Sequence, residues 1–279
     1  MFDSKIKKLI LGVSAALAMM YSPAYATTTI KIGVAANFSA TLNSIISSFQ
    51  NYYNGSGYTF VVTVDSTTNL KNAIIAGGAT GPYDLFLSAD YAAPLALYTS
   101  YNSLVVGSPF KYAIGSLELY SGPANTVDIS AGLPSPLTTN LVLADPTKAP
   151  YGKAASQVLA SSPWNITTIP SGYVFTRANI NATYSAVQAG TYTYGFVAKS
   201  AICQYYSGAE HYVAGTYHHE YLYNDAAHPY TQIQQYGIEI ALSRTAAQNT
   251  ELTNFVNFLT GVGTTLGTAI IQKYCYLLP

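Results

Sequence analysis

Charged residues are scarce in this 279-residue chain, because Lys, Arg, Asp and Glu together make up only 9% of it. Twelve Lys and Arg are balanced by twelve Asp and Glu, so the formal net charge is zero. A nucleic-acid-binding surface needs a basic patch that neutralises phosphates, and this composition does not supply one. Tyr, by contrast, occurs 26 times. We therefore expect a polar surface built from hydroxyl and amide groups, and no nucleic-acid partner.

Long apolar runs are absent after residue 26, since no later segment reaches the roughly 18 to 20 apolar residues that a membrane-spanning helix requires. Residues 1–26 have the pattern of a secretory signal peptide. Lys5, Lys7 and Lys8 precede the apolar residues 9–20, and Ala24-Tyr25-Ala26 fits an A-x-A cleavage site. We predict cleavage after Ala26 and a periplasmic protein. The mature chain would carry nine basic and eleven acidic side chains, a net charge of −2.

Motifs of common enzyme classes are absent too. The chain contains no G-x-S-x-G elbow, no H-E-x-x-H pair and no Walker loop. The nearest paired carboxylates, Asp84 and Asp90, lie in a predicted strand and the loop after it, where structural roles are expected. We therefore expect a chain that is not an enzyme and needs no cofactor.

Cysteine is represented by Cys203 and Cys275 alone, and both would enter an oxidising compartment. A disulfide between them would close a long loop. The sequence does not decide between that bridge and two buried free thiols, because it does not give the distance between their Cα atoms.

Strand-like and helix-like patterns alternate along the chain, which predicts an α/β fold. The expected strands are residues 28–36, 58–64, 83–87, 113–120, 141–144, 173–176, 195–197 and 236–242. The expected helices are 39–52, 152–160, 181–188 and 249–259, the last of which begins a helical C-terminal tail. A further helix is expected from the N-cap cluster Ser66-Thr67-Thr68 to Gly77-Gly78. Apolar strands in repeated βα units favour mainly parallel sheets flanked by helices. The region 204–235, rich in Tyr and His, is expected to be irregular.

About 253 mature residues exceed the usual size of a single core, so two lobes are expected. We assign residues 27–112 and 236–279 to the first lobe and residues 113–235 to the second. The strands 113–120 and 236–242 are the expected crossings between the lobes.

Four strand-to-helix corners carry the candidate binding residues. Asn37, Thr67, Tyr151 and Ile180 each lie at a predicted helix start. A helix start presents unpaired backbone N–H groups and the positive end of the helix dipole, which attract an anion without a basic side chain. The alternative is that the Ser, Thr and Asn side chains at these corners serve only as N-caps.

Five segments carry a resemblance to a known family. They are Val34-Ala-Ala-Asn-Phe38, Tyr83-Asp-Leu-Phe-Leu-Ser-Ala-Asp90, Phe110-Lys-Tyr-Ala-Ile-Gly115, Ala144-Asp-Pro-Thr-Lys-Ala-Pro-Tyr-Gly-Lys-Ala-Ala155 and Gly195-Phe-Val-Ala198. In this order and spacing the chain resembles the periplasmic molybdate-binding proteins of ABC importers, in particular the subgroup with the Ala-Asn-Phe string. The resemblance covers essentially the whole mature chain.

This resemblance implies a two-lobed, type II periplasmic-binding-protein fold that closes on molybdate or tungstate and delivers it to a membrane permease. It implies a monomer with ligand-binding residues Ala36, Asn37, Thr67, Tyr151 and Ile180. At Ala36, Tyr151 and Ile180 the implied contact is a backbone N–H group. Closure would occur by a hinge, with each lobe supplying two corners.

The chain departs from the family pattern in three places. Asp65 stands where many relatives have glycine, close to the proposed anion site, and a carboxylate facing an oxyanion would oppose binding. Ala198 stands where some members have a tyrosine that donates to the anion. Residues 204–230 form a Tyr- and His-rich segment without a clear family counterpart.

That segment supports two alternative hypotheses. Imidazole groups from His211, His218, His219 and His228 could bind a metal ion or metal complex, although their spacing matches no compact metal motif. Alternatively, the Tyr rings could stack on an organic anion, which would need a pocket of several hundred Å³.

Overall fold

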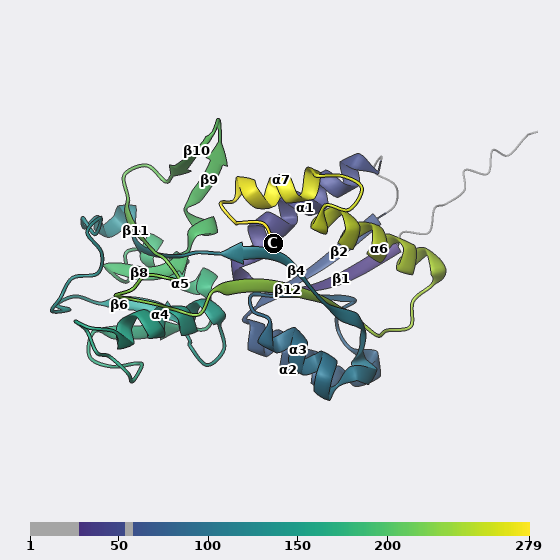
Figure 1. Cartoon of the computed structure of the whole chain (residues 1–279), viewed down its shortest axis with the longest axis horizontal. Helices are drawn as coiled ribbons and strands as arrows, with labels where there is room; N and C mark the ends of the chain where they lie inside the picture. The colour runs from purple at the N-terminus through teal and green to yellow at the C-terminus, as the bar shows by residue number, and fades with distance from the viewer. Residues whose placement is uncertain (1–27, 54–57) are drawn as a thin grey trace, which may run out of the picture.

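The computed structural model describes residues 28–53 and 58–279 and contains two lobes that lie side by side (Figure 1). Each lobe is built on a five-stranded sheet with helices against it. The predicted signal peptide, residues 1–26, lies outside the described residues. Among the residues described, no helix is long and apolar enough to cross a membrane.

The first lobe has the strand order β2-β1-β3-β12-β4. Its strands are β1 (Thr28–Ala35), β2 (Tyr58–Asp65), β3 (Leu85–Ser88), β4 (Val105–Gly115) and β12 (Ile233–Ile240). Its helices are η1 (Ala36–Phe38), α1 (Ser39–Tyr52), α2 (Thr67–Gly77), η2 (Gly78–Thr80), α3 (Ala92–Ser100), η3 (Asn102–Leu104), α6 (Ala246–Thr260) and α7 (Leu266–Lys273).

The second lobe has the strand order β11-β5-β8-β6-β7. Its strands are β5 (Leu117–Ser121), β6 (Leu141–Ala144), β7 (Val174–Arg177), β8 (Tyr194–Ala198) and β11 (Tyr217–Tyr221). Its helices are η4 (Pro123–Asn125), α4 (Pro150–Ala160), α5 (Ile180–Gln188) and η5 (Lys199–Ala201). A separate two-stranded hairpin, β9 (Cys203–Tyr206) with β10 (Ala209–Tyr212), projects from this lobe (Figure 1).

Burial follows the apolar pattern of the sequence. All four residues of β3 and all four of β6 are buried, as expected for short strands covered on both faces. Helix α1 buries Leu42, Ile45 and Phe49, which recur at helical spacing, and leaves its opposite face to solvent. These elements therefore hold the ends of the strands, where the helices begin, in fixed positions.

Each sheet is mixed rather than mainly parallel, which corrects one detail of the expected fold. In the first sheet β1 pairs in parallel with β2 and β3, whereas β12 is antiparallel to β3 and β4. The second sheet likewise has parallel β6–β7 and β6–β8 pairs beside antiparallel β5–β8 and β5–β11 pairs. The antiparallel strands are those that follow a crossing between lobes, so they arrive without a βα crossover.

The chain passes between the lobes twice. The expected single strand 113–120 is wrong: it is divided at Ser116 into the end of β4 in one sheet and β5 in the other. The return runs through residues 222–232 into β12. The lobe limits expected at 112/113 and 235/236 stay a prediction, and beside them β4 runs to Gly115 and β12 begins at Ile233.

The region 204–235 was expected to be irregular, and the structure contradicts this. Its Tyr residues, which favour strands, contribute to the β9–β10 hairpin and to β11, an edge strand of the second sheet. The open question about the cysteines is also answered. Cys203 and Cys275 form a disulfide, with their Cα atoms 5.9 Å apart.

Candidate anion-binding site

A cavity of about 10 Å³ lies between the lobes, and all five ligand-binding residues expected from the sequence line it. The lining residues are Ala35, Ala36, Asn37, Ser66, Thr67, Ala89, Ala149, Pro150, Tyr151, Asn179 and Ile180. Ala36, Asn37 and Thr67 come from the first lobe, whereas Tyr151 and Ile180 come from the second. The fold thus brings together four chain segments that are far apart in sequence.

The first corner follows β1, where the short helix η1 runs directly into α1. The side-chain amide nitrogen of Asn37 donates to Gln235 Oε1 at 2.8 Å and to the Tyr276 hydroxyl at 3.0 Å. Both amide protons of Asn37 therefore have protein partners. What this corner can offer an anion is backbone N–H, not the Asn37 side chain.

The second corner lies at the start of α2. Ser66 caps the helix through a side-chain bond from the Asn69 amide. The hydroxyl of Thr67, a buried residue, accepts a bond from the Ala89 amide at 3.2 Å. Because that bond uses an oxygen lone pair, the hydroxyl proton of Thr67 is left to be donated toward the cavity.

The third and fourth corners are the starts of α4 and α5. Pro150 occupies the first position of α4, which suits its missing N–H, and Tyr151 is the next residue. Ile180 is the first residue of α5, whose preceding residue Asn179 accepts from the Ala182 amide. The first amides of both helices have no partner within their own helix, so they can donate to an anion.

The side chain of Tyr151 is turned away from the cavity toward the crossing between the lobes. It is 1% exposed, and its hydroxyl lies where a Cβ atom on Gly115 would be. Glycine is thus required at the end of β4 for the Tyr151 ring to fit. The contribution of Tyr151 to the cavity is accordingly its backbone, in agreement with the role implied by the family resemblance.

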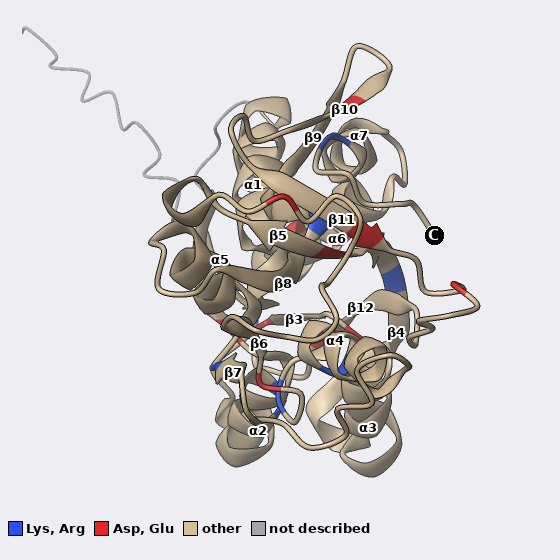
Figure 2. Cartoon of the chain, turned by 90° about the vertical axis from the view of Figure 1, so that its left-hand side faces the viewer, with Lys and Arg blue, Asp and Glu red and all other residues tan. Residues whose placement is uncertain are grey.

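No residue that lines the cavity carries a charge. Charged segments are few along the described part of the chain (Figure 2). Asp65, which was expected to oppose an anion, is not among the lining residues. Its carboxylate accepts from the Ser66 amide at 2.6 Å and from the Asn69 side chain at 3.1 Å, so it is engaged in the first turn of α2.

Hydrogen bonds across the cleft hold the lobes together around the cavity. The Thr68 amide donates to the Lys148 carbonyl at 3.1 Å, which joins α2 to the segment before α4. The Asn181 side chain donates to the Ser39 hydroxyl at 3.0 Å, which joins α5 to α1. The described arrangement is therefore a closed one, with direct contacts between the lobes.

Behind the cavity lies a group of buried hydroxyl and amide side chains, formed by Asn37, Tyr112, Ser200, Gln235 and Tyr276. The Tyr276 hydroxyl donates to the Asn37 carbonyl at 2.8 Å, and it accepts from the Ser200 hydroxyl at 2.9 Å. The Tyr112 hydroxyl lies 3.1 Å from Gln235 Oε1. Burial raises the pKa of both Tyr112 and Tyr276, so these phenols keep their protons and act as donors.

The sequence argument did not identify Gln235, Tyr276 or Ser200. These residues meet Asn37 over sequence separations of 198, 239 and 163 positions, which no local pattern encodes. The position of Tyr276 directly after Cys275, at the end of a helical tail, was a weak indication of a structural role.

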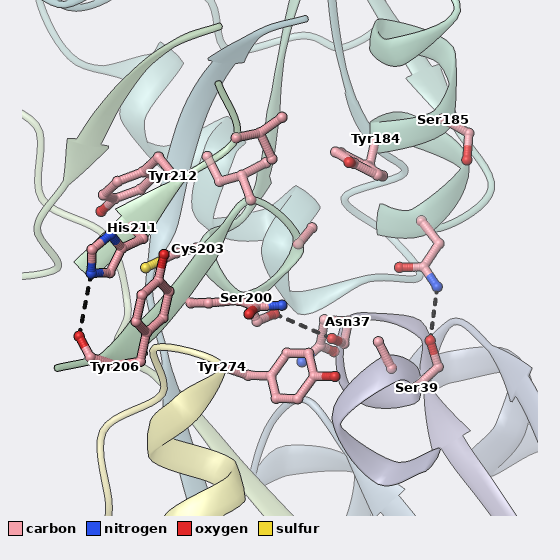
Figure 3. A pocket seen from close by; sticks show the side chains of 16 residues that line it. Asn37, Ser39, Tyr184, Ser185, Ser200, Cys203, Tyr206, His211, Tyr212 and Tyr274 are labelled. Carbon is pink, nitrogen blue, oxygen red and sulfur yellow. Dashed lines mark hydrogen bonds between the residues drawn. The ribbon is translucent and has the colours of Figure 1, made fainter. Parts of the chain in front are cut away.

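A larger pocket of about 500 Å³ adjoins the candidate anion site and shares Asn37 with it (Figure 3). It is lined by residues of both lobes and of the β9–β10 hairpin, including Tyr184, Tyr206, Tyr212 and Tyr274. His211 stacks on Tyr206, with ring centroids 3.7 Å apart, so each of these two rings already packs against the other.

The four histidines that were considered as metal ligands do not converge. His218 stacks on Tyr212, His219 bonds to the Ser130 carbonyl, and His228 packs against Trp164. Within the described ranges, the one group of three potential ligands is Cys203, Glu210 and Cys275, and its two sulfur atoms form the disulfide. The geometry does not favour the metal hypothesis.

Comparisons with known proteins agree with this arrangement. Residues 30–276 match the model of the family described as bacterial extracellular solute-binding protein. The molybdate-binding protein ModA of Azotobacter vinelandii is 31% identical over 198 residues, which cover 71% of this chain and 74% of that protein. ModA of Rhodobacter capsulatus is 33% identical over 171 residues, which cover 61% and 64% of the two chains.

Among solved structures, the periplasmic molybdate-binding protein of Azotobacter vinelandii superimposes with a TM-score of 0.69 at 25% identity. The match covers 90% of this chain and 99% of that one. It confirms the two-lobed type II binding-protein fold. These relatives bind solutes and are not enzymes, as expected from the missing catalytic motifs. The chain belongs to the bacterial extracellular solute-binding proteins.

Proposed function

We propose that this chain is the periplasmic component of an ABC importer that captures molybdate or tungstate and delivers it to a membrane permease. The observation that carries the proposal is the convergence of Ala36, Asn37, Thr67, Tyr151 and Ile180 on one uncharged cavity between the lobes. Helix-start amides and one free hydroxyl are donors suited to a tetrahedral oxyanion. The relatives named above, which are molybdate-binding proteins, support the same ligand.

The cleft works as a hinge in this proposal. The present cavity holds about one water-sized group, so a five-atom oxyanion requires the lobes to part on entry and to close at a slightly wider separation. Each lobe contributes two of the four corners, so the anion bridges the lobes and favours the closed form. Released from its signal peptide after Ala26, the protein would act as a monomer in the periplasm.

Selectivity would follow from the size of the anion and from whether the anion carries a proton. Sulfate is smaller than molybdate, and a cleft fitted to the larger anion leaves its donors too far from sulfate oxygens. Protonated phosphate needs an acceptor for its proton, and the cavity lining offers donors only at its corners. The carboxylate of Asp65 does not supply that acceptor, because Asp65 does not line the cavity and its carboxylate is turned to Ser66 and Asn69.

Isothermal titration of the ligand-stripped mature protein tests the proposal. Molybdate, tungstate, sulfate and phosphate are titrated separately in metal-free buffer. We expect one-to-one, tight binding of molybdate and tungstate, and no heat from sulfate or phosphate. Binding heat with sulfate alone would show that the ligand is sulfate and not molybdate. The absence of binding heat with all four anions would overturn the proposal.

A further inference from the structure

The Cys203–Cys275 disulfide joins the two lobes. Cys203 is the first residue of β9, which continues from β8 and η5 of the second lobe. Cys275 follows α7 of the first lobe, 72 positions later in the chain. The bond therefore connects two lobes that are otherwise joined only by two chain crossings and by non-covalent contacts.

The Cys203 side of the bond is firmly attached to the second lobe. The Val213 amide donates to the Ile202 carbonyl, which closes the base of the β9–β10 hairpin. Tyr212 packs against the core of the second lobe, and its ring stacks on His218 of β11. The Lys199 ammonium lies 2.7 Å from Glu220 of β11 and 2.9 Å from Glu210 of β10. The hairpin base cannot shift without disturbing these contacts.

The Cys275 side is attached to the first lobe just as closely. Tyr276 is 3% exposed and belongs to the hydrophobic core beneath α1 and α6. Leu277 exchanges two backbone hydrogen bonds with Ile114 of β4, at 2.8 and 3.0 Å. The cysteine is thus held between the end of α7 and an anchored tail.

The bond lies close to the first crossing between the lobes. The Lys199 amide donates to the carbonyl of Ser116, the residue between β4 and β5, and only three residues separate Lys199 from Cys203. A disulfide tolerates Cα separations of about 4.4 to 6.8 Å. The observed 5.9 Å leaves little range, so the two anchored segments move apart by no more than a small step.

What the bond holds together is one end of the cleft. Three residues before Cys203, Ser200 of the second lobe donates to the Asn37 carbonyl of the first (Figure 3). The Ser200 hydroxyl also donates to the Tyr276 hydroxyl of the first lobe. The contact between Thr68 and Lys148 joins α2 to the segment just before α4. Helices α2 and α4 lie on the other side of the molecule from α7 and β9 (Figures 1 and 2). No covalent bond joins the lobes there.

We propose that the Cys203–Cys275 disulfide is a strap that limits the opening of the cleft. It keeps Ser200 against Asn37 and Tyr276, so the lobes part on the side of α2 and α4 and over a restricted angle. Restricting the open ensemble raises the fraction of molecules close to the binding-competent arrangement. The effect on affinity rests on the proposed function, whereas the effect on opening does not.

The test compares the double variant Cys203→Ser/Cys275→Ser with the unchanged protein, first without ligand. Non-natural amino acids that carry an azide replace Ala76 of α2 and Ala160 of α4, both of which are exposed. A spin label is attached to each azide, so that no added cysteine is needed, and the distance between the two labels is measured. We expect the label-to-label distribution of the double variant to broaden and to shift to longer distances by several Å. Superimposable distributions would overturn the strap.

Reduction of the unchanged protein provides the second measurement, and it covers the case in which the double variant fails to fold. A dithiol reductant exchanges with the S–S bond, which is cleaved to two thiols, and is itself oxidised to its cyclic disulfide, so two electrons and two protons pass from the reductant to the protein. Removing the reductant and reoxidising should restore the narrow distribution. A distribution that does not respond to reduction contradicts the strap independently of the variants.

A titration with molybdate then examines the consequence for affinity. We expect the dissociation constant to rise by about threefold or more once the bond is absent, because more of the free protein is open. If the unchanged protein does not bind molybdate, the proposed function fails, and the ligand-free distances still decide the strap. If the distances change but the dissociation constant does not, the strap limits opening without contributing to affinity, and that part of the inference is wrong.

Discussion

The side-chain amide of Asn37 donates to Gln235 Oε1 at 2.8 Å, which bonds a residue of the candidate anion cavity to the strand by which the chain returns between the lobes. Both residues are buried, and Gln235 is 0% exposed. The corner at Asn37, which lines the candidate anion cavity, is therefore positioned by β12 as well as by its own helix.

Replacing Asn37 by aspartate should abolish molybdate binding. The new carboxylate would face the Gln235 amide oxygen in place of an N–H donor, and it would place a negative charge beside the anion cavity. Titration calorimetry measures the loss. Asn43→Asp, the same chemical change on the exposed face of α1, should leave the dissociation constant unchanged. Unchanged affinity in the Asn37 variant would remove the anion site from this cavity.

Replacing Thr67 by alanine should weaken molybdate binding by about 5- to 30-fold, because one hydrogen bond from a neutral hydroxyl to the anion, worth about 1 to 2 kcal/mol, is lost. The Ala89 amide also loses its acceptor. Thr67→Ser keeps the hydroxyl and should bind within about twofold of the unchanged protein. Equal affinity of the alanine and serine variants would show that the hydroxyl does not touch the anion.

Replacing Tyr276 by phenylalanine should lower the free energy of unfolding by about 1 to 3 kcal/mol, since the Asn37 carbonyl and amide and the Ser200 hydroxyl are left buried with one partner fewer. Urea unfolding measures this change. Tyr274→Phe is the matched control, because its hydroxyl has a part-buried bond to Ser44. A Tyr276 variant as stable as the Tyr274 variant would argue against the buried hydroxyl group described above.

Glu251 makes stability depend on pH. It lies in α6, is 1% exposed, and its carboxylate oxygens have no hydrogen-bond partner among the described residues. Burial raises the pKa of this carboxyl from 4.5 to about 7. Between these values the unfolded chain loses the proton while the folded chain keeps it. Stability should therefore fall as the pH rises from about 4.5 to 7, by on the order of 1 to 3 kcal/mol, and then level off.

Glu251→Gln should remove most of this decline, because glutamine does not titrate. Unfolding midpoints measured at several pH values between 4 and 8 test the prediction. Parallel curves for the variant and the unchanged protein would assign the pH dependence to other groups, such as Glu118, whose pKa burial also raises.

Local patterns predicted the elements that carry a strong period. Helix α1 occupies Ser39–Tyr52, the range expected from its apolar spacing, and α2 begins after the Ser66 cap. The start of α6 was placed three residues late, although Thr245 and Gln248 form a capping box that marks it. Helix starts are encoded within a few residues, so the sequence contains them.

Features that depend on distant segments were not predictable in the same way. The division of one apolar run at Ser116 follows from which sheet each half joins, and the apolar pattern is the same in both. The pairing of Cys203 with Cys275 and the bonds from Gln235 and Tyr276 to Asn37 arise only once both lobes are in place. The residues implied at the four corners do line one cavity, yet their contacts with an anion stay a prediction.

The uncharged lining of the cavity has a consequence for the molecule as a whole. With no cation in the lining, a captured dianion adds its full charge to the protein, and the mature chain would change from a net charge of −2 to about −4. Loaded and empty molecules would then migrate differently in an electric field and elute separately from an anion exchanger. A membrane receptor could distinguish them at a distance by this difference in charge, before any surface contact is made.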